Sequence, residues 1–167
     1  VMAACEAVRD LLPVPMQAVR QGFMLVDLPG RFQVLPGRPT VVLDVAHNPQ
    51  AAGVLSENLA SMGFFPETWA VVGMLSDKDV AGSVRLLRDR VDHWVVASLP
   101  GPRGLDAQGL AAILRECGVA TDILECGSPQ EAYALAHGRA RSGLSRRRTG
   151  RSGAGGDRAC RPELVAR

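Results

Sequence analysis

The residues best suited to chemistry are polar side chains that follow short apolar runs. Asp44 ends one such run in 40-TVVLDVAHNPQ-50, and His47 comes shortly after it. The stretches 76-SDKD-79 and 100-PGPRG-104 follow two further runs. Carboxylates accept hydrogen bonds from hydroxyl groups, whereas Lys and Arg bind phosphate oxygens. These residue types are typical of a site for a polar or phosphorylated ligand.

Apolar, β-branched runs alternate with segments of helical period from residue 40 onward. The expected strands cover residues 40–45, 68–74, 93–98 and 121–124. The expected helices cover residues 49–62, 79–91, 106–117 and 129–139. This alternation predicts an α/β fold with a Rossmann-like, mostly parallel sheet and flanking helices. Ligands of such sheets bind at the carboxyl ends of the strands, so we expect the polar residues to gather there.

Each expected helix begins beside a residue that can cap it. Asn48, Asp106 and Ser128 are expected to cap three of the helices, and either Asp77 or Asp79 the fourth. Upstream of residue 28 the sequence favours helix, interrupted by two closely spaced prolines. A short extended piece is expected at 32–35, between two Pro-Gly turns.

Residue type and spacing leave a structural alternative for every candidate. Asp44 could stabilise the start of the next helix, and His47 could be a turn residue. The 76–79 stretch could be a solvated turn, and Arg31 and Arg103 could be ordinary loop charges. The sequence contains neither G-x-x-x-x-G-K-[ST] nor G-x-G-x-x-G. Spacing alone therefore predicts a polar-ligand domain and nothing more specific.

Composition limits the class of protein. The 167 residues, 47% of them hydrophobic, are enough for one domain with a substantial core. No apolar run approaches the roughly 20 residues that span a bilayer, and the first residues do not resemble a signal peptide. The four cysteines form no C-x-x-C pair, which favours reduced thiols in a cytoplasmic protein without a metal site.

Charge separates the last residues from the rest. Residues 141–167 contain eight Arg and two acidic residues, whereas residues 1–140 carry a net negative charge. The 141–167 tail is rich in Arg, Gly and Ser and has no recognisable strand run. We expect it to be disordered, because it offers little apolar surface to bury. The abrupt change of composition at residue 141 suggests a shift of reading frame in the coding sequence.

Four blocks of sequence carry a family resemblance. They are 28-LPGRFQ-33, 43-LDVAHNPQAA-52, 72-VGMLSDKD-79 and 99-LPGPRG-104. In this order and at these separations they resemble the C-terminal part of bacterial folylpolyglutamate synthase/dihydrofolate synthase, a branch of the Mur ligase superfamily. The resemblance covers about residues 1–140. It implies a fold of the Mur ligase C-terminal domain type, incomplete at its C-terminal end because the tail does not match.

The resemblance also implies roles for particular residues. Arg31 and Asp44 match the family's arginine and aspartate that contact ATP. His47 and Lys78 would lie near the cleft between domains, as candidate catalytic residues.

Two further acidic residues, Asp77 and Asp79, would line the same opening as cofactor-binding residues. No metal ligand is expected in this chain, because the resemblance implies that the Mg²⁺ ligands and phosphate-binding loop lie in a preceding ATPase domain. Residues 1–27 resemble the last helices of that domain, 28–140 form the α/β domain, and 141–167 match nothing.

The implied activity is ATP-dependent ligation of L-glutamate to dihydropteroate or folate through an acyl phosphate. The implied partners are ATP, Mg²⁺ and these substrates, with no membrane and no specific nucleic acid. We expect the full-length enzyme to be a monomer and this chain alone to be inactive.

Two alternatives remain open on sequence. One is a non-catalytic nucleotide-binding or scaffold module that uses the basic tail for anionic partners. The other is a ligase of the peptidoglycan branch. The motifs L-P-G-R-F-Q and G-P-R-G do not fit that branch.

Overall fold

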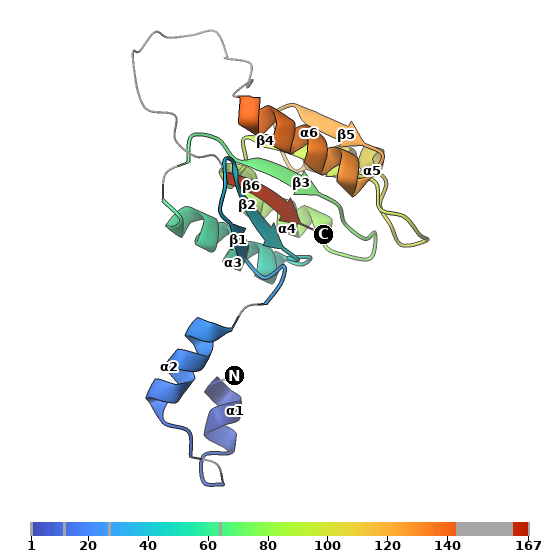
Figure 1. Cartoon of the computed structure of the whole chain (residues 1–167). Helices are drawn as coiled ribbons and strands as arrows, with labels where there is room; N and C mark the ends of the chain where they lie inside the picture. The colour runs from blue at the N-terminus through green and yellow to red at the C-terminus, as the bar shows by residue number, and fades with distance from the viewer. Residues whose placement is uncertain (1, 12, 27, 64, 143–161, 167) are drawn as a thin grey trace.

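The structure is a computed structural model that describes residues 2–11, 13–26, 28–63, 65–142 and 162–166 (Figure 1). For the last of these ranges only the course of the backbone is described. The strands are β1 (Gln33–Leu35), β2 (Thr40–Asp44), β3 (Trp69–Val72), β4 (His93–Ala97), β5 (Ile123–Cys126) and β6 (Pro162–Ala166). The helices are α1 (Met2–Ala7), α2 (Met16–Leu25), α3 (Pro49–Ser61), α4 (Val80–Leu87), the 3₁₀ helix η1 (Arg88–Arg90), α5 (Ala107–Glu116) and α6 (Pro129–Ser142).

All six strands form one sheet in the order β1-β2-β6-β3-β4-β5. Only β1 is antiparallel to its neighbour; the pairs β2–β6, β6–β3, β3–β4 and β4–β5 are all parallel. The helices between the parallel strands cover the sheet, as expected for βαβ units. The prediction of an α/β fold with a mostly parallel sheet is confirmed.

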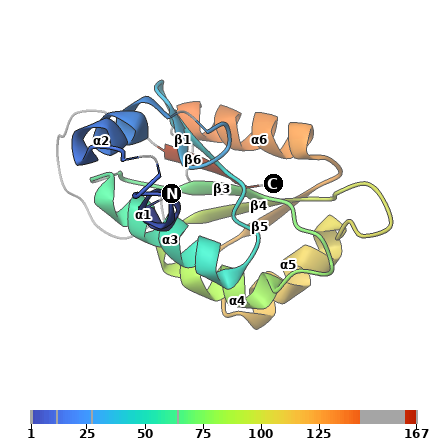
Figure 2. The same ribbon diagram turned by 90° about the horizontal axis from the view of Figure 1, so that it is seen from below.

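The sheet is covered on both faces. In Figure 2, α3, α4 and α5 lie on one side of the sheet and α6 lies on the other. The side chains of β4 divide accordingly: Trp94 and Val96 belong to the core cluster under α3–α5, whereas Val95 and Ala97 belong to the cluster under α6. A strand with two buried faces needs apolar residues at successive positions, which explains the uninterrupted apolar runs in the sequence.

The helices begin where the capping residues predicted. Asn48 Oδ1 accepts a hydrogen bond from the Ala51 N–H (2.9 Å) at the start of α3. Asp106 Oδ1 accepts from the Gly109 N–H (2.6 Å) at the start of α5. These caps satisfy backbone donors that have no partner within the helix. Of the two candidates for α4, Asp79 is the cap.

The structure corrects one prediction for the tail. We expected no strand after residue 140, yet Pro162–Ala166 forms β6 between β2 and β3. The slot between two parallel strands offers backbone donors and acceptors on both sides, and a short segment can fill it. Proline is tolerated as the first residue of a strand. The prediction missed β6 because PELVA begins with Pro and Glu and so lacks the continuous apolar run that marked the other parallel strands. The remaining tail predictions concern residues 143–161 and 167, which lie outside the described residues.

The N-terminal helices differ from the rest. The predicted helical character upstream of residue 28 is confirmed by α1 and α2, which Figure 1 places beside each other and apart from the α/β body. None of the residues of α2 is buried, and Phe23 and Leu25 are exposed apolar side chains. That residues 1–27 belong to a preceding domain stays a prediction. None of the helices in the described ranges is long and apolar enough to cross a membrane.

Candidate functional site

The candidate residues lie in loops at the carboxyl edge of the parallel sheet. The loop after β2 contains His47, and the loop after β3 contains the 76–79 stretch. The loop after β4 contains Arg103, and the turn before β1 lies beside the end of β2. Because parallel strands end at the same edge, these loops become neighbours although they are far apart in sequence.

Asp44 joins two of these segments. Its Oδ2 accepts a hydrogen bond from the Phe32 N–H (2.7 Å), and its Oδ1 accepts one from the Ala46 N–H (2.7 Å). The first bond ties the turn before β1 to the end of β2, and the second shapes the loop that leaves β2. Asp44 is half-buried, which suits a carboxylate that is hydrogen-bonded on both oxygens. It does not cap α3, because Asn48 does.

Arg31 is presented by that turn. Its N–H donates to the Leu28 carbonyl (3.0 Å), and the two residues beside it, Gly30 and Phe32, both have left-handed backbone angles (φ 69° and 47°). The Arg31 side chain is exposed to solvent. A guanidinium held on a fixed turn at this edge is available for an anionic ligand.

His47 lies on the loop between β2 and α3. Its Nδ1 is 2.9 Å from the Val45 carbonyl oxygen, a contact in which the ring nitrogen must be the donor, since a carbonyl only accepts. This leaves Nε2 as an acceptor when the imidazole is neutral. The side chain is exposed, so Nε2 can reach a ligand at the edge.

The loops after β3 and β4 are braced against each other. The Ser76 N–H donates to the Arg103 carbonyl (2.8 Å), and the Leu105 N–H donates to the Met74 carbonyl (3.0 Å). Arg103 Nη1 also pairs with Asp77 Oδ2 at 3.2 Å. The half-buried Lys78 therefore sits on a loop whose backbone is held from two sides.

Asp79 has a structural task in this loop. Its Oδ1 accepts from the Gly82 N–H (2.8 Å) at the start of α4, and its carbonyl accepts from the Ser83 hydroxyl (2.8 Å). This contact and the Asp77–Arg103 pair account for both carboxylates without a ligand. That the two residues bind a cofactor stays a prediction.

The loop offers a matched pair of substitutions. Asp79→Ala should lower the free energy of unfolding by about 1 kcal/mol, because it removes the α4 cap. Asp77→Ala should lower it by less than about 0.5 kcal/mol, since its ion pair is largely solvent-exposed. Urea denaturation of both variants measures the difference. An equal loss in the two variants would contradict the assignment of Asp79 as the cap.

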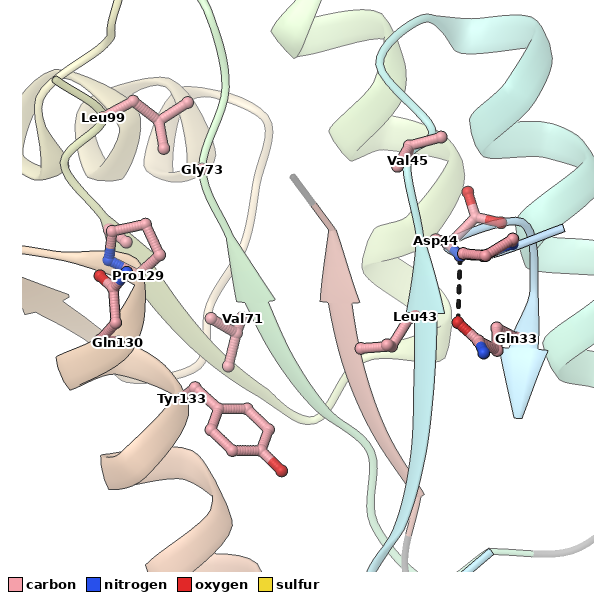
Figure 3. Close-up of a pocket in the computed structure, with 13 residues that line it drawn as sticks. Gln33, Leu43, Asp44, Val45, Val71, Gly73, Leu99, Pro129, Gln130 and Tyr133 are labelled. Carbon is pink, nitrogen blue, oxygen red and sulfur yellow. Dashed lines mark hydrogen bonds between the residues drawn. The ribbon is translucent and has the colours of Figure 1, made fainter. Parts of the chain in front are cut away.

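A pocket of about 520 Å³ opens beside Asp44 on the face of the sheet that α6 partly covers (Figure 3). Leu43, Val71 and Tyr133 face it from β2, β3 and α6 in Figure 3. Its other lining residues are Pro29, Gly30, Gln33, Asp44, Val45, Gly73, Ala97, Leu99, Pro129 and Gln130. The pocket is mainly apolar, with amide, carboxylate and phenol groups at its margin. Tyr133, on the α6 side of the pocket, was not among the predicted site residues, although it is the single tyrosine of the chain.

The pocket does not include every predicted site residue. Asp44 lines it, whereas Arg31 lines a neighbouring surface with Val26, Leu28 and Phe32. His47 and the predicted residues in the 76–79 stretch line neither the pocket nor this neighbouring surface. The structure thus places all six at one edge of the sheet but does not enclose them in a single pocket.

Two observations in the described ranges concern cysteine and metal chemistry. Burial raises the pKa of the Cys126 thiol, and the negative charge of Glu131 raises it further. Such a thiol stays protonated at neutral pH and is a poor nucleophile. Among the described residues, no group of three or more His, Cys, Asp or Glu could hold a metal ion.

Comparison with known proteins identifies relatives of this chain in sequence and in fold. The dihydrofolate synthase/folylpolyglutamate synthase of Escherichia coli K12 is 44% identical over 99 residues, which are 59% of this chain and 24% of that enzyme. The solved structure of E. coli FolC in complex with ADP superposes with a TM-score of 0.75 at 32% identity, over 99% of this chain and 34% of that one. A bifunctional folylpolyglutamate synthase/dihydrofolate synthase with Mn, AMPPNP and L-glutamate bound gives a TM-score of 0.67 at 37% identity, over 93% and 32% of the two chains.

The chain therefore spans about a quarter of the length of this curated relative. The relatives are ligases of the folate branch, which favours that branch over the peptidoglycan branch and over a non-catalytic module. The family model described as "Mur ligase, glutamate ligase domain" matches residues 30–145, from the turn before β1 to just beyond α6. The chain belongs to the Mur ligase family, with the glutamate ligase domain as its matched part.

Proposed function

We propose that this chain supplies the C-terminal domain of an ATP-dependent ligase that adds L-glutamate to dihydropteroate, to folate, or to both. The observation that carries the proposal is Arg31, exposed on a turn that Asp44 holds at the carboxyl edge of the sheet. Relatives with ADP or AMPPNP bound support a nucleotide as the ligand. The relative with L-glutamate bound supports an amino-acid co-substrate.

The nucleotide contacts are assigned to Arg31 and Asp44. The planar guanidinium of Arg31 presents several N–H donors, which suits phosphate oxygens. An ionised carboxylate has about four acceptor positions, and the two backbone N–H groups occupy only part of them. Asp44 can therefore accept from ribose hydroxyls without releasing the turn. Asp77 and Asp79 would line the outer part of the same opening.

The substrate contacts are assigned to His47 and Lys78. The ammonium group of Lys78 would neutralise charge on the acyl phosphate or on the carboxylates of glutamate. Nε2 of neutral His47 would accept a proton from the attacking amine. Both residues follow strands of the sheet, on loops that its carboxyl edge brings together.

The reaction has two steps. A carboxylate oxygen of the pterin substrate attacks the γ-phosphorus of ATP, which gives an acyl phosphate and ADP. The amine of L-glutamate then attacks the acyl carbon, the amide bond forms, and phosphate leaves. Catalysis of this kind depends mainly on positioning and on neutralising phosphate charge. The roles assigned here to residues of this chain are nucleotide and substrate contacts.

A fusion experiment tests the proposal. The chain is joined to the N-terminal part of the E. coli relative in place of the matching segment, and glutamate incorporation into dihydropteroate is measured with ATP. The fusion should form product, whereas the chain alone should form none. The N-terminal part of the E. coli relative without this chain is the control for background activity. Product from the unfused chain, or an inactive but folded fusion, would contradict the proposal.

A further inference from the structure

We propose that Asp44 is a positioning residue for Arg31, which acts through the backbone of Phe32 as well as through any contact with the nucleotide. The inference rests on the proposed function, because it concerns how the same site holds its cation. It differs from a purely ligand-binding role, in which Asp44 and Arg31 would act independently.

The first observation is where the Asp44–Phe32 bond lies. The antiparallel pairing of β1 with β2 runs Leu35↔Val41, Val34↔Val42 and Gln33↔Leu43. One residue beyond Gln33, the Phe32 N–H donates to the carboxylate of Asp44 and not to the backbone of β2. The Asp44 side chain thus extends the attachment of the two segments past the last residue pair of the strands.

The second observation is the conformation of Phe32. Its φ of 47° lies in the left-handed region, which is unfavourable for a residue with a bulky side chain. A residue stays in that region only when its surroundings hold it there. Two contacts do so: the bond from its N–H to Asp44 (2.7 Å), and the packing of its ring against the core cluster under α3–α5.

The third observation is that Arg31 sits inside this turn. Gly30, on its other side, is also left-handed, and its N–H donates to the Gln33 side chain (3.2 Å), the bond drawn in Figure 3. A Cβ on Gly30 would lie 3.2 Å from Val45 Cγ1, so the turn packs closely on the end of β2. The direction in which Arg31 leaves the backbone therefore depends on the conformation of its two neighbours.

The charge of Asp44 makes it suited to this role. A carboxylate that accepts two short hydrogen bonds from backbone N–H groups binds them more strongly than a neutral amide would. Asp44→Asn keeps the size of the side chain and leaves one oxygen as an acceptor, but it puts an NH₂ group opposite one of the two donors. The variant should fold, and it should loosen the turn at Phe32.

A double-mutant cycle separates the two roles. ADP affinity is measured by calorimetry for the wild-type chain, Asp44→Asn, Arg31→Ala and the double variant. If Asp44 also acts through Arg31, Asp44→Asn should weaken ADP binding about three- to tenfold in the wild type and by a clearly smaller factor, that of its own nucleotide contact, in the Arg31→Ala background. The same weakening in both backgrounds would mean that Asp44 acts independently of Arg31, and it would overturn the proposal.

Hydrogen exchange provides a readout that does not need the nucleotide. In the ligand-free chain, Asp44→Asn should speed exchange of the Phe32 amide and shift the Arg31 amide resonance. Asp44→Ser, with one shorter acceptor, should do the same if Asp44→Asn proves unstable. Unchanged exchange at Phe32 in both variants would also overturn the proposal. If the chain binds no ADP, alone or fused, the proposed function is contradicted. Faster exchange of the Phe32 amide in Asp44→Asn would then still support the role of Asp44 in holding the turn.

Asp106→Asn is the matched control. Asp106 is also an aspartate at the carboxyl edge that accepts a backbone N–H, but that bond caps α5 and does not involve the turn at Phe32. This substitution makes the same chemical change at another acceptor of a backbone N–H and should leave ADP affinity and exchange at Phe32 unchanged, because Asn caps a helix about as well as Asp. A similar loss of ADP affinity in Asp106→Asn would mean that a nonspecific effect of replacing an aspartate at this edge explains the result for Asp44→Asn. The positioning role of Asp44 would then be contradicted.

Discussion

Arg31→Ala is expected to weaken ADP binding about 10- to 100-fold, which matches the 1.5–3 kcal/mol of a hydrogen bond to a charged group. The physical reason is that the Arg31 guanidinium is exposed to solvent on the turn, so the effect of its loss should fall on the ligand. Thermal stability should stay unchanged within experimental error. Calorimetric titration of the chain with ADP, or the KM for ATP of the fused enzyme, measures the effect.

Two further variants sharpen this test. Arg31→Lys keeps the charge but loses the planar fork of donors, so it should give an intermediate affinity. Arg38→Ala removes the same charge from an exposed residue at the far end of the β1–β2 hairpin, and it should bind ADP normally. Equal losses in Arg31→Ala and Arg38→Ala would point to long-range attraction and would remove Arg31 from the site.

Gly104→Ala is expected to lower the free energy of unfolding by about 2–3 kcal/mol, near the upper end of single substitutions. A Cβ at this position would overlap the Leu99 carbonyl oxygen and lie 3.0 Å from the Pro100 carbonyl oxygen. Backbone atoms cannot move aside as a flexible side chain can. The loop would have to shift, and the bonds that join it to the loop after β3 would be strained. For a chain of this size the midpoint of thermal unfolding should fall by about 5–10 °C.

The same substitution at another glycine is the control. Gly138 lies within α6, and a Cβ there meets no atom within 4 Å. Gly138→Ala should therefore stabilise the chain by about 0.5–1 kcal/mol, because alanine favours helix. Chemical denaturation of the two variants should give changes of opposite sign. A neutral Gly104→Ala would mean that the loop after β4 is free to relax, which would contradict the bracing described here.

Much of the fold was predictable because its signals are local. The predicted strand at 40–45 is β2 (Thr40–Asp44), and the predicted helix at 49–62 is α3 (Pro49–Ser61). Capping residues gave the helix starts to within a residue. The strand expected at 121–124 is β5 at Ile123–Cys126, and it shifted because the residues before it form a turn without a clear apolar boundary.

The candidate site was predictable in location but not in its contacts. Parallel strands place their loops at one edge, and sequence motifs marked those loops. The sequence could not reveal that Asp44 binds the Phe32 N–H, twelve residues away, or that Asp77 pairs with Arg103. Such contacts depend on the register between strands and on the direction of each side chain, which no short pattern encodes.

The sequence by itself determined the alternation of strands and helices, the caps, the family and the edge that carries the polar residues. The strands, helices and caps follow from neighbours within about one turn of helix or one strand, whereas the family follows from the order and spacing of four short blocks between residues 28 and 104. Only the tertiary structure decided that Pro162–Ala166 pairs between β2 and β3 and that α6 helps to form a pocket beside Asp44. The same holds for the bond from the Phe32 N–H, next to Arg31, to the carboxylate of Asp44 in β2. These features arise from contacts between segments far apart in the chain, which exist only once the sheet has formed.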